Sequence, residues 1–331
     1  MKLHGIKSPA DFHTPAQRAF LADANENCKD YADGNAAADA PSPVSLSWDA
    51  DAPGPYTVKI GENADLSDAR VFKTDAPSLD VYNLKLNARY YWTVGDATPA
   101  TFVTVDAPPR NLSVGGVMNV RDLGGWKTVD GKRVKQGLLF RTSALDYFSD
   151  SEKKMKNCAD ADGLRTLKET LGIKTEIDLR VEHDGDPGYP PEGKTESVLG
   201  EGVRYLHCPI LLGPENYLNS VDSLKAVFRT LADPTNYPVA YHCAVGADRT
   251  GSVTYLILGL LGVKEDDVMR DYLWTNFSNQ RMYRPPINRG YKVTIDEAPG
   301  QTLREKIRYI LTERIGIKKE TLDKVIENLT E

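Results

Sequence analysis

The 331-residue sequence predicts an α/β domain, a mostly parallel sheet with helices on both faces, preceded by a small all-β sandwich. From residue 109 onward, short apolar β-prone runs alternate with longer helical runs, the order typical of a parallel sheet. Before that point, short runs of alternating polarity follow one another at strand-like intervals, as in antiparallel sandwiches. The chain is long enough for two domains.

The first 40 residues are expected to form a helical lead and a linker. Thr14 and Pro15 are typical of a helix start, because threonine caps the first turn and proline is tolerated within it. Residues 33–40 are rich in Ala, Asp and Gly, which favours a linker.

Residues 41–108 are expected to form the sandwich. Its predicted strands are 44–48, 56–60, 70–74, 78–81, 89–94 and 101–105. The Leu-Ser-Trp opening and the Tyr-Tyr-Trp-Thr-Val strand resemble a fibronectin type III or immunoglobulin-like domain. Trp48 and Trp92 are predicted to pack in its core rather than to bind a sugar.

Residues 109–331 are expected to form the α/β domain. The predicted strands are 137–141, 173–179, 204–209 and 239–242. The predicted helices are 163–171, 220–231, 250–261, 265–277, 303–315 and 321–329. In such sheets ligands bind where the parallel strands end, so site residues are expected at those positions.

The most informative stretch is His242-Cys243-Ala244-Val245-Gly246-Ala247-Asp248-Arg249-Thr250-Gly251, between a predicted strand and a predicted helix. Loop amides before a helix N-terminus have no intrahelical partner, and the helix dipole adds positive potential there. Ala244, Val245, Gly246 and Ala247 would therefore supply phosphate-binding amides, and glycine lets the loop curl.

The side chains of the same stretch predict chemistry on that phosphate. Arg249 offers a planar fork of donors for two phosphate oxygens. The positive field favours the nucleophilic thiolate of Cys243, to which Thr250 can donate its hydroxyl. His242 is expected to organise the loop rather than to act as a base. A buried structural cysteine is the alternative, and it leaves Asp248 and Arg249 unexplained.

The decapeptide resembles the phosphate loop of cysteine-dependent protein tyrosine phosphatases, and its Asp-Arg ending is similar to a bacterial family with dual- and triple-specificity members. Residues 119–125, 137–143 and 176–180 fit other motifs of that family, so the resemblance covers about residues 112–280. It implies hydrolysis of phosphate monoesters through a phosphocysteine. No cofactor or metal is expected, because the loop supplies the positive charge. Ala247 stands where some members carry lysine, which speaks against a polyanionic inositol lipid as the best substrate.

The general acid that protonates the leaving oxygen is not evident from a motif. Many tyrosine phosphatases carry it in a Trp-Pro-Asp loop, and that tripeptide is absent. Asp248 is preferred, with Asp178 and Glu215 as reserves.

Four further residues are expected to support the site. Asp178 and Arg180 form either an internal ion pair that braces the sheet or a direct part of the active site. Arg121 is expected to pair with Asp122 and to fix the glycine-rich turn beneath the loop, and direct contact with the substrate is the alternative.

Cys208 is a possible redox partner of Cys243. The strands that they end are joined by one helix, which predicts parallel neighbours and Cα atoms within the disulfide range of about 4.4–6.8 Å. A nearby thiol captures an oxidised cysteine before it reacts further. Cys208 as a small apolar filler is the alternative. The four cysteines show neither metal-ligand spacing nor a disulfide framework.

Composition limits the classes of partner that the chain is expected to bind. A formal net charge of -6 gives no sign of nucleic-acid or membrane affinity, and no stretch is long enough to span a bilayer. The amino terminus lacks the apolar segment of a signal peptide, so a cytoplasmic location is expected, or an extracytoplasmic one if a leader has been removed. The expected partner is a phosphorylated protein or a small phosphate ester, and the sequence assigns no partner to the sandwich.

Three functions are compatible with these residues. Hydrolysis of protein phosphotyrosine, with dual specificity as an extension, fits best. A phosphoinositide or inositol phosphate phosphatase is the second. A non-catalytic phospho-binding module is the third, and the intact Cys243 and Arg249 disfavour it.

Overall fold

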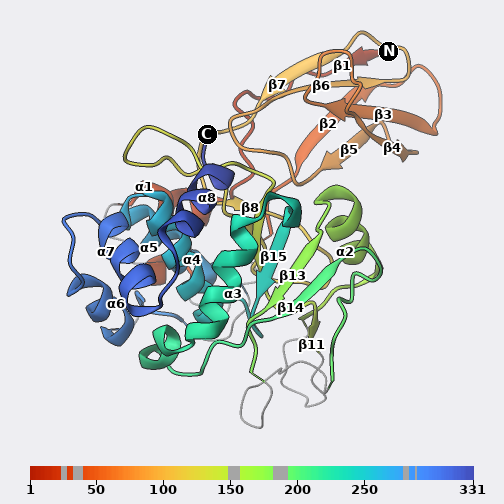
Figure 1. Cartoon of the computed structure of the whole chain (residues 1–331). Coiled ribbons are helices and arrows are strands. Elements are labelled where there is room, and N and C mark those ends of the chain that lie inside the picture. The colour runs from red at the N-terminus through yellow and green to blue at the C-terminus, as the bar shows by residue number, and fades with distance from the viewer. Residues whose placement is uncertain (24–27, 33–39, 148–156, 182–192, 279–282, 288) are drawn as a thin grey trace.

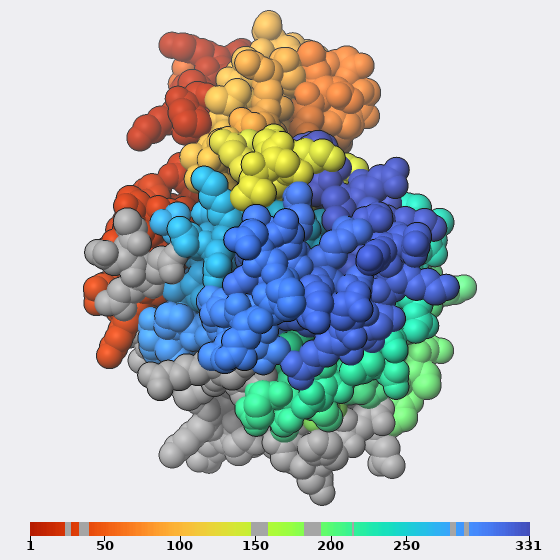
Figure 2. All heavy atoms as spheres, turned by 60° about the vertical axis from the view of Figure 1, so that its left-hand side comes forward, coloured from red at the N-terminus to blue at the C-terminus, as the bar shows by residue number. Residues whose placement is uncertain are grey.

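The computed structural model describes residues 1–23, 28–32, 40–147, 157–181, 193–278, 283–287 and 289–331. They form a smaller all-β body that stands on a larger α/β body (Figures 1 and 2). In Figure 2 the first part of the chain, drawn red to orange, runs from the smaller body down the side of the larger one.

The smaller body contains two antiparallel sheets, with the strand orders β1-β2-β5 and β4-β3-β6-β7. The strands are β1 (Lys2–Leu3), β2 (Val44–Asp49), β3 (Tyr56–Gly61), β4 (Arg70–Thr74), β5 (Ser78–Val81), β6 (Arg89–Val94) and β7 (Ala100–Val103). Side chains of both sheets share one apolar cluster, which includes Trp48, Val58 and Trp92. The core positions of both tryptophans are confirmed, and the likeness to a fibronectin type III domain stays a prediction.

The first 40 residues contribute to both bodies. Lys2–Leu3 pairs with β2, whereas helix α1 (Pro15–Ala22) packs Phe20 against Trp274 of the larger body. The Thr14 side chain caps α1 as predicted, with the Gln17 amide as donor. Residues 33–39 of the predicted linker lie outside the described residues, and the division into three segments stays a prediction.

The larger body is built on a six-stranded sheet of order β14-β13-β15-β10-β9-β8. The strands are β8 (Arg110–Asn111), β9 (Arg121–Asp122), β10 (Leu139–Thr142), β13 (Thr175–Asp178), β14 (Arg204–His207) and β15 (Val239–His242). The first four in this order run parallel, whereas β9 runs antiparallel to both of its neighbours, β10 and β8. The predicted mostly parallel sheet is therefore present. A separate two-stranded ribbon consists of β11 (Asp146–Tyr147) and β12 (Asn157–Cys158).

Helices cover both faces of this sheet. They are α2 (Ala161–Arg165), α3 (Val221–Ala232), α4 (Asp248–Leu261), α5 (Glu265–Trp274), α6 (Arg289–Asp296), α7 (Leu303–Tyr309) and α8 (Lys319–Leu329). Tyr241 of β15 packs into the cluster that α3, α4, α5, α7 and α8 share. Ala240, the preceding residue, belongs to the apolar cluster on the other face of the sheet. That cluster includes Leu167, which lies in the π-helical turn that continues α2. In the described part of the chain, no helix is long and apolar enough to cross a membrane.

One predicted neighbour relation is wrong. Strand β13 lies between β14 and β15, although β14, α3 and β15 follow one another in sequence. The chain places β14 at the sheet edge and then returns through α3 to the centre, because a crossover helix can skip one strand.

Candidate active site

The loop between β15 and α4 has a conformation that requires its glycine. Cys243, Ala244 and Ala247 are buried. Gly246 has a φ of 67°, in the left-handed region. A Cβ at this position would lie 2.4 Å from the Thr142 carbonyl oxygen, so a larger residue would displace the loop.

Four successive carbonyl groups of this loop are bound from outside. His242 Nδ1 lies 3.2 Å from the Cys243 oxygen, and the Ala144 amide donates to the Ala244 oxygen at 3.1 Å. The Asn119 side-chain amide donates to the oxygens of Val245 and Gly246, at 3.4 and 2.9 Å. Arg141 also donates to the Gly246 oxygen, at 2.7 Å.

These contacts determine where the loop amides point. In a trans peptide the N–H points opposite to the preceding C=O, and the cis bonds of the described residues all precede proline. The amides of residues 244–247 therefore point away from the donors that hold the carbonyls. Among the described residues, the amides of Val245, Gly246 and Ala247 have no acceptor. With the N-terminus of α4 beside them, they form a site for an anion.

A group of four buried side chains, termed here the loop-support cluster, consists of Asn119, Arg121, Arg141 and Asp271. Asp271 Oδ1 accepts from Arg141 at 2.7 Å, and its backbone oxygen accepts from Arg121 at 2.9 Å. Arg121 also donates to the Asn119 side-chain oxygen. Burial alone would raise the pKa of Asp271, but the two arginines outweigh it and lower that pKa. The cluster thus carries two guanidinium groups and one carboxylate below the loop.

The predicted salt bridge between Arg121 and Asp122 is wrong. Successive residues of a strand point to opposite faces of the sheet, and these two residues are β9. Asp122 instead accepts from Arg110 at 2.6 Å and from the Gly124 and Gly137 amides at 2.8 and 2.6 Å. It fixes the glycine-rich turn, as expected, but with a different cation.

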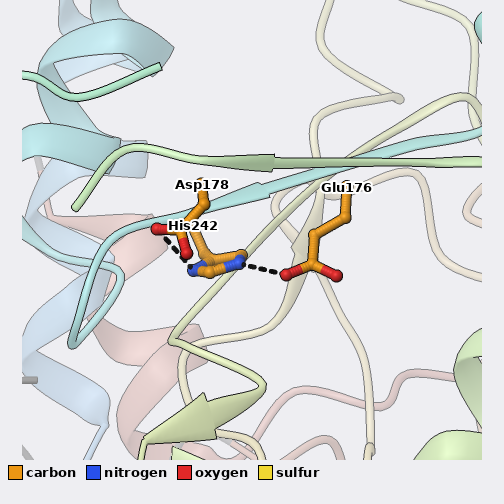
Figure 3. Close-up of side chains that lie close together, drawn as sticks. All are labelled: Glu176, Asp178 and His242. Atoms are coloured by element: carbon orange, nitrogen blue, oxygen red, sulfur yellow. Dashed lines mark hydrogen bonds and ion pairs between the residues drawn. The ribbon is translucent and has the colours of Figure 1, made fainter. Parts of the chain in front are cut away.

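A second group, the strand-end cluster, consists of the buried Glu176, Asp178, Arg180 and His242 and the partly buried Asp146 and Lys194. Figure 3 shows that the His242 ring lies between two carboxylates, with Nε2 3.0 Å from Glu176 Oε1 and Nδ1 3.8 Å from Asp178 Oδ1. Arg180 Nη2 lies 2.5 Å from Asp178 Oδ2 and 2.8 Å from Asp146 Oδ1. Of the two interpretations offered by the sequence, the internal ion pair of Asp178 and Arg180 is present.

Glu176, Asp178 and His242 offer ligand atoms within 4.8 Å of one another, which is a geometry that could hold a metal ion. Their lone pairs already have partners. Lys194 lies 3.0 Å from Glu176, Tyr205 donates to Asp178 at 3.0 Å, and Ser197 donates to Glu176. The donor set therefore fits an ion-pair network better than a cation site.

A match to a protein family shows which family this loop and these clusters belong to. Residues 112–331 match the model of the tyrosine phosphatase family. The chain belongs to the tyrosine phosphatase family. The match spans the whole six-stranded sheet except β8, together with the loop and both clusters.

Two curated relatives agree with the family match. A candidate tyrosine-protein phosphatase of Cupriavidus necator is 26% identical over 205 residues, which cover 54% of this chain and 68% of the relative. The triple specificity protein phosphatase PtpB of Mycobacterium tuberculosis is 26% identical over 200 residues, which cover 49% of this chain and 68% of that relative. Among solved structures, the catalytic core of a Saccharomyces cerevisiae PP-IP phosphatase is similar. The match covers 55% of this chain and 87% of that structure, at 17% identity and a TM-score of 0.33. The family and the named relatives make this chain a phosphoric monoester hydrolase.

Among the candidate acids of this phosphatase, Asp248 is the one in the loop itself. Its side chain is 43% exposed and lies 3.5 Å from Arg284 Nη2. The Tyr272 hydroxyl faces the same carboxylate, and burial together with that carboxylate raises the pKa of Tyr272. Glu215 is exposed, in the 3-10 helix Pro214–Asn219 that precedes α3.

Asp178 does not fit the role of a general acid. It is fully buried, and Arg180 binds both of its carboxylate oxygens. Burial alone would raise the pKa of Asp178, but His242 and Arg180 outweigh it and hold that pKa well below its usual range. A carboxyl group in this state has no proton to give near neutral pH.

Several residues near the loop were not predicted as site residues, among them Asn119, Arg141, Asp271 and Tyr217. Asp271 and Arg141 join the loop-support cluster from α5 and β10. Tyr217 lies close enough to Asp248 and Cys243 for their charges, after burial, to raise its pKa. The sequence offered one signal for Asp271: it stands three residues after Val268, a helical spacing that places an acidic residue on the buried face of α5.

Cys208 is poorly placed as a redox partner. Its strand β14 is separated from β15 by β13, and two strand spacings amount to about 9–10 Å, beyond the Cα distance of a disulfide. Burial, followed by the charge of Asp178, raises the pKa of the Cys208 thiol to about 11. Cys208 is buried in the apolar cluster below the helices, which favours the filler interpretation.

Proposed function

We propose that the chain hydrolyses protein phosphotyrosine through a phosphocysteine intermediate. Cys243 attacks phosphorus and displaces the tyrosine oxygen, while Arg249 and the amides of residues 244–247 hold the three remaining oxygens. Water then attacks the phosphocysteine, releasing phosphate and restoring the thiolate. The proposal rests above all on the four loop carbonyls that are bound from outside, because they turn the intervening amides toward one anion site.

Thr250 supports the same mechanism. Its hydroxyl is buried and has no hydrogen-bond partner among the described residues. Buried hydroxyl groups without a partner are uncommon, since each costs about 1–3 kcal/mol. A donor at the start of α4 would be satisfied by the thiolate of Cys243 or by a bound phosphate oxygen.

Asp248 is the proposed general acid. It is the first residue of α4, and its partly exposed carboxyl group is supported by Arg284 and Tyr272. Glu215 is the remaining reserve. Replacing Asp248 by Asn should slow an alkyl phosphate far more than p-nitrophenyl phosphate, because p-nitrophenolate leaves without a proton. Equal losses on both substrates would move the role to Glu215.

The nucleophile is tested with Cys243→Ser, which keeps the shape and replaces a thiolate by a protonated hydroxyl. Turnover of p-nitrophenyl phosphate should fall by ~10³-fold or more while orthovanadate or phosphate still binds. Cys208→Ser is the matched control, a buried cysteine outside the loop that should keep its activity. Full turnover by Cys243→Ser, or an absolute need for a divalent metal after chelation, would contradict the mechanism.

The substrate class is tested with a panel of phosphotyrosine and phosphoserine peptides, a phosphoinositide and an inositol phosphate. Phosphotyrosine peptides should give the highest kcat/KM. Ala247 is buried and adds no cation beside the phosphate, in contrast to a site for a polyanionic headgroup. Preference for the phosphoinositide would overturn this ranking, and binding without any turnover would favour a phospho-binding module.

A further inference from the structure

The smaller β body binds the edge of the larger sheet through specific hydrogen bonds. Asn83, in the connection between β5 and β6, has a φ of 63°. Its side chain donates to the Ser113 oxygen at 2.9 Å and accepts from the Ser113 amide at 2.7 Å. Asn83 thus holds both polar groups of the backbone two residues after β8.

Arg110 of β8 makes the second connection, and it is 4% exposed. It donates to the oxygens of Asn83 and Leu84 in the smaller body, both at 2.9 Å. Its Nη1 donates to Asp122 of β9 at 2.6 Å. One buried guanidinium group therefore joins the smaller body to β8 and β9.

The neighbours of these residues face α5 and the loop-support cluster. Strands β8 and β9 have two residues each, and their register pairs Arg110 with Asp122 and Asn111 with Arg121. Asn111 accepts from Trp274 Nε1 of α5 at 2.7 Å, while Arg121 binds Asp271 and Asn119. Because side chains alternate along a strand, one face of β8 and β9 binds the smaller body and the other belongs to the loop-support cluster.

We propose that the N-terminal β body is a positioning element of the phosphatase site. By holding β8 and β9 it fixes Arg121 and Asn119, and Asn119 in turn holds the Val245 and Gly246 carbonyls whose peptides supply loop amides. Asn83 and Arg110 are then positioning residues that act on catalysis without touching the substrate. The proposal rests on the proposed role of the loop, and it assigns an intramolecular task to a body that lies outside the family match.

The first test compares two interface variants in the full chain. Asn83→Gly removes both side-chain hydrogen bonds to Ser113 and keeps the left-handed backbone accessible. The matched control is Gln136→Ala, which also removes two hydrogen bonds across the same interface, to the Leu86 amide and oxygen at 2.8 and 2.9 Å. Gln136 precedes β10, and among the described residues the hydrogen bonds of its side chain go to Leu86 and not to β8, β9 or the loop-support cluster.

Asn83→Gly should lower kcat for p-nitrophenyl phosphate about tenfold and raise the inhibition constant of orthovanadate by a similar factor, because misplaced amides bind the transition state less well. Gln136→Ala should stay within about twofold of the wild type. Thermal unfolding of both variants confirms that they are folded at the assay temperature. Equal losses in the two variants would show general loosening of the interface and would overturn the proposal.

The second test asks whether Asn83 acts through Asn119. Asn119 also has a positive φ, of 57°, so Asn119→Gly removes its amide without straining the backbone. If the effect passes through Asn119, the double variant should lose no more activity than Asn119→Gly alone. If the loss in the double variant equals the product of the two single losses, the proposal is overturned. Failure of the proposed function is distinguishable, because it would appear as retained turnover in Cys243→Ser.

Discussion

Two clusters of charged side chains flank the phosphate loop, and they differ in the balance of cations and carboxylates. The loop-support cluster has two cations, Arg121 and Arg141, against Asp271. The strand-end cluster has three carboxylates, and these face Arg180, Lys194 and the His242 ring. The second cluster therefore has no excess of positive charge, whereas the first has two guanidinium groups for one carboxylate.

The difference fits what each cluster touches. The loop-support cluster donates to the Val245 and Gly246 oxygens, directly below the proposed phosphate site. Burial, and then the charge of Arg141, lowers the pKa of Arg121 to about 10, and the two guanidinium groups exceed the one carboxylate by a single charge. An incoming phosphate dianion would be stabilised by that excess. The strand-end cluster joins the ends of β13 and β15 and carries no such excess of positive charge.

Removing the carboxylate of the loop-support cluster should have the largest effect. Asp271→Asn leaves two buried guanidinium groups without a counter-charge, a change that typically costs about 3–5 kcal/mol. Denaturant unfolding should show this loss, and turnover should fall with it. Asp267→Asn, one turn earlier on α5, is the control: among the described residues Asp267 pairs with Arg270 at 3.5 Å, and the variant should change stability by less than about 1 kcal/mol. Similar stability of the two variants would contradict the comparison.

The strand-end cluster should tolerate neutralisation better. Glu176→Gln keeps the size of the side chain, and Lys194 retains its partner Asp146 at 2.8 Å. We expect a loss of about 1–3 kcal/mol in unfolding free energy. The effect on kcat should be smaller than for Asp271→Asn, since the carbonyls of residues 244–246 are held elsewhere. A loss of kcat as steep as in Asp271→Asn would remove the functional distinction between the clusters.

The strand-end cluster should also be visible in the pH dependence of stability. Burial would raise the pKa of Asp178, but His242 and Arg180 lower it below its unfolded value. The stability that the Asp178 carboxylate contributes is fully present above its unfolded pKa of about 4. It is lost as the pH falls toward the folded pKa. Thermal midpoints measured from pH 6 down to pH 3 should decrease, and Asp178→Asn should flatten that decrease. An unchanged slope in Asp178→Asn would rule out this carboxylate as its source.

The sequence revealed the loop because its residues are contiguous. Cys243, Gly246 and Arg249 occur within seven positions, and a strand and a helix bound them. Asp178 and Arg180 were recognisable for the same reason, being two residues apart. The alternation of strands and helices was sufficient to predict the parallel part of the sheet.

The parts that were missed are assembled from distant segments. The loop-support cluster combines β9, β10 and α5, and no local pattern pairs Arg121 with Asp271 rather than with adjacent Asp122. Strands β8 and β9 are too short to show a period of two, so the sheet edge that binds the smaller body was not predicted. The order of β13, β14 and β15 was also missed, because the length of a crossover does not reveal which strand it skips.

The smallest effect is expected for Cys208, where the strand order reverses the sequence-based hypothesis. With β13 between the two cysteines and the Cys208 pKa raised to about 11, little thiolate is available to capture an oxidised Cys243. Sulfenic acid on Cys243 would then proceed to the irreversible sulfinic form at the same rate with or without Cys208. Wild type and Cys208→Ala should therefore recover equal activity when peroxide treatment is followed by a reductant. Poorer recovery in Cys208→Ala, or a Cys208–Cys243 peptide in mass spectra, would mean that the sheet ends move together by several ångströms on oxidation.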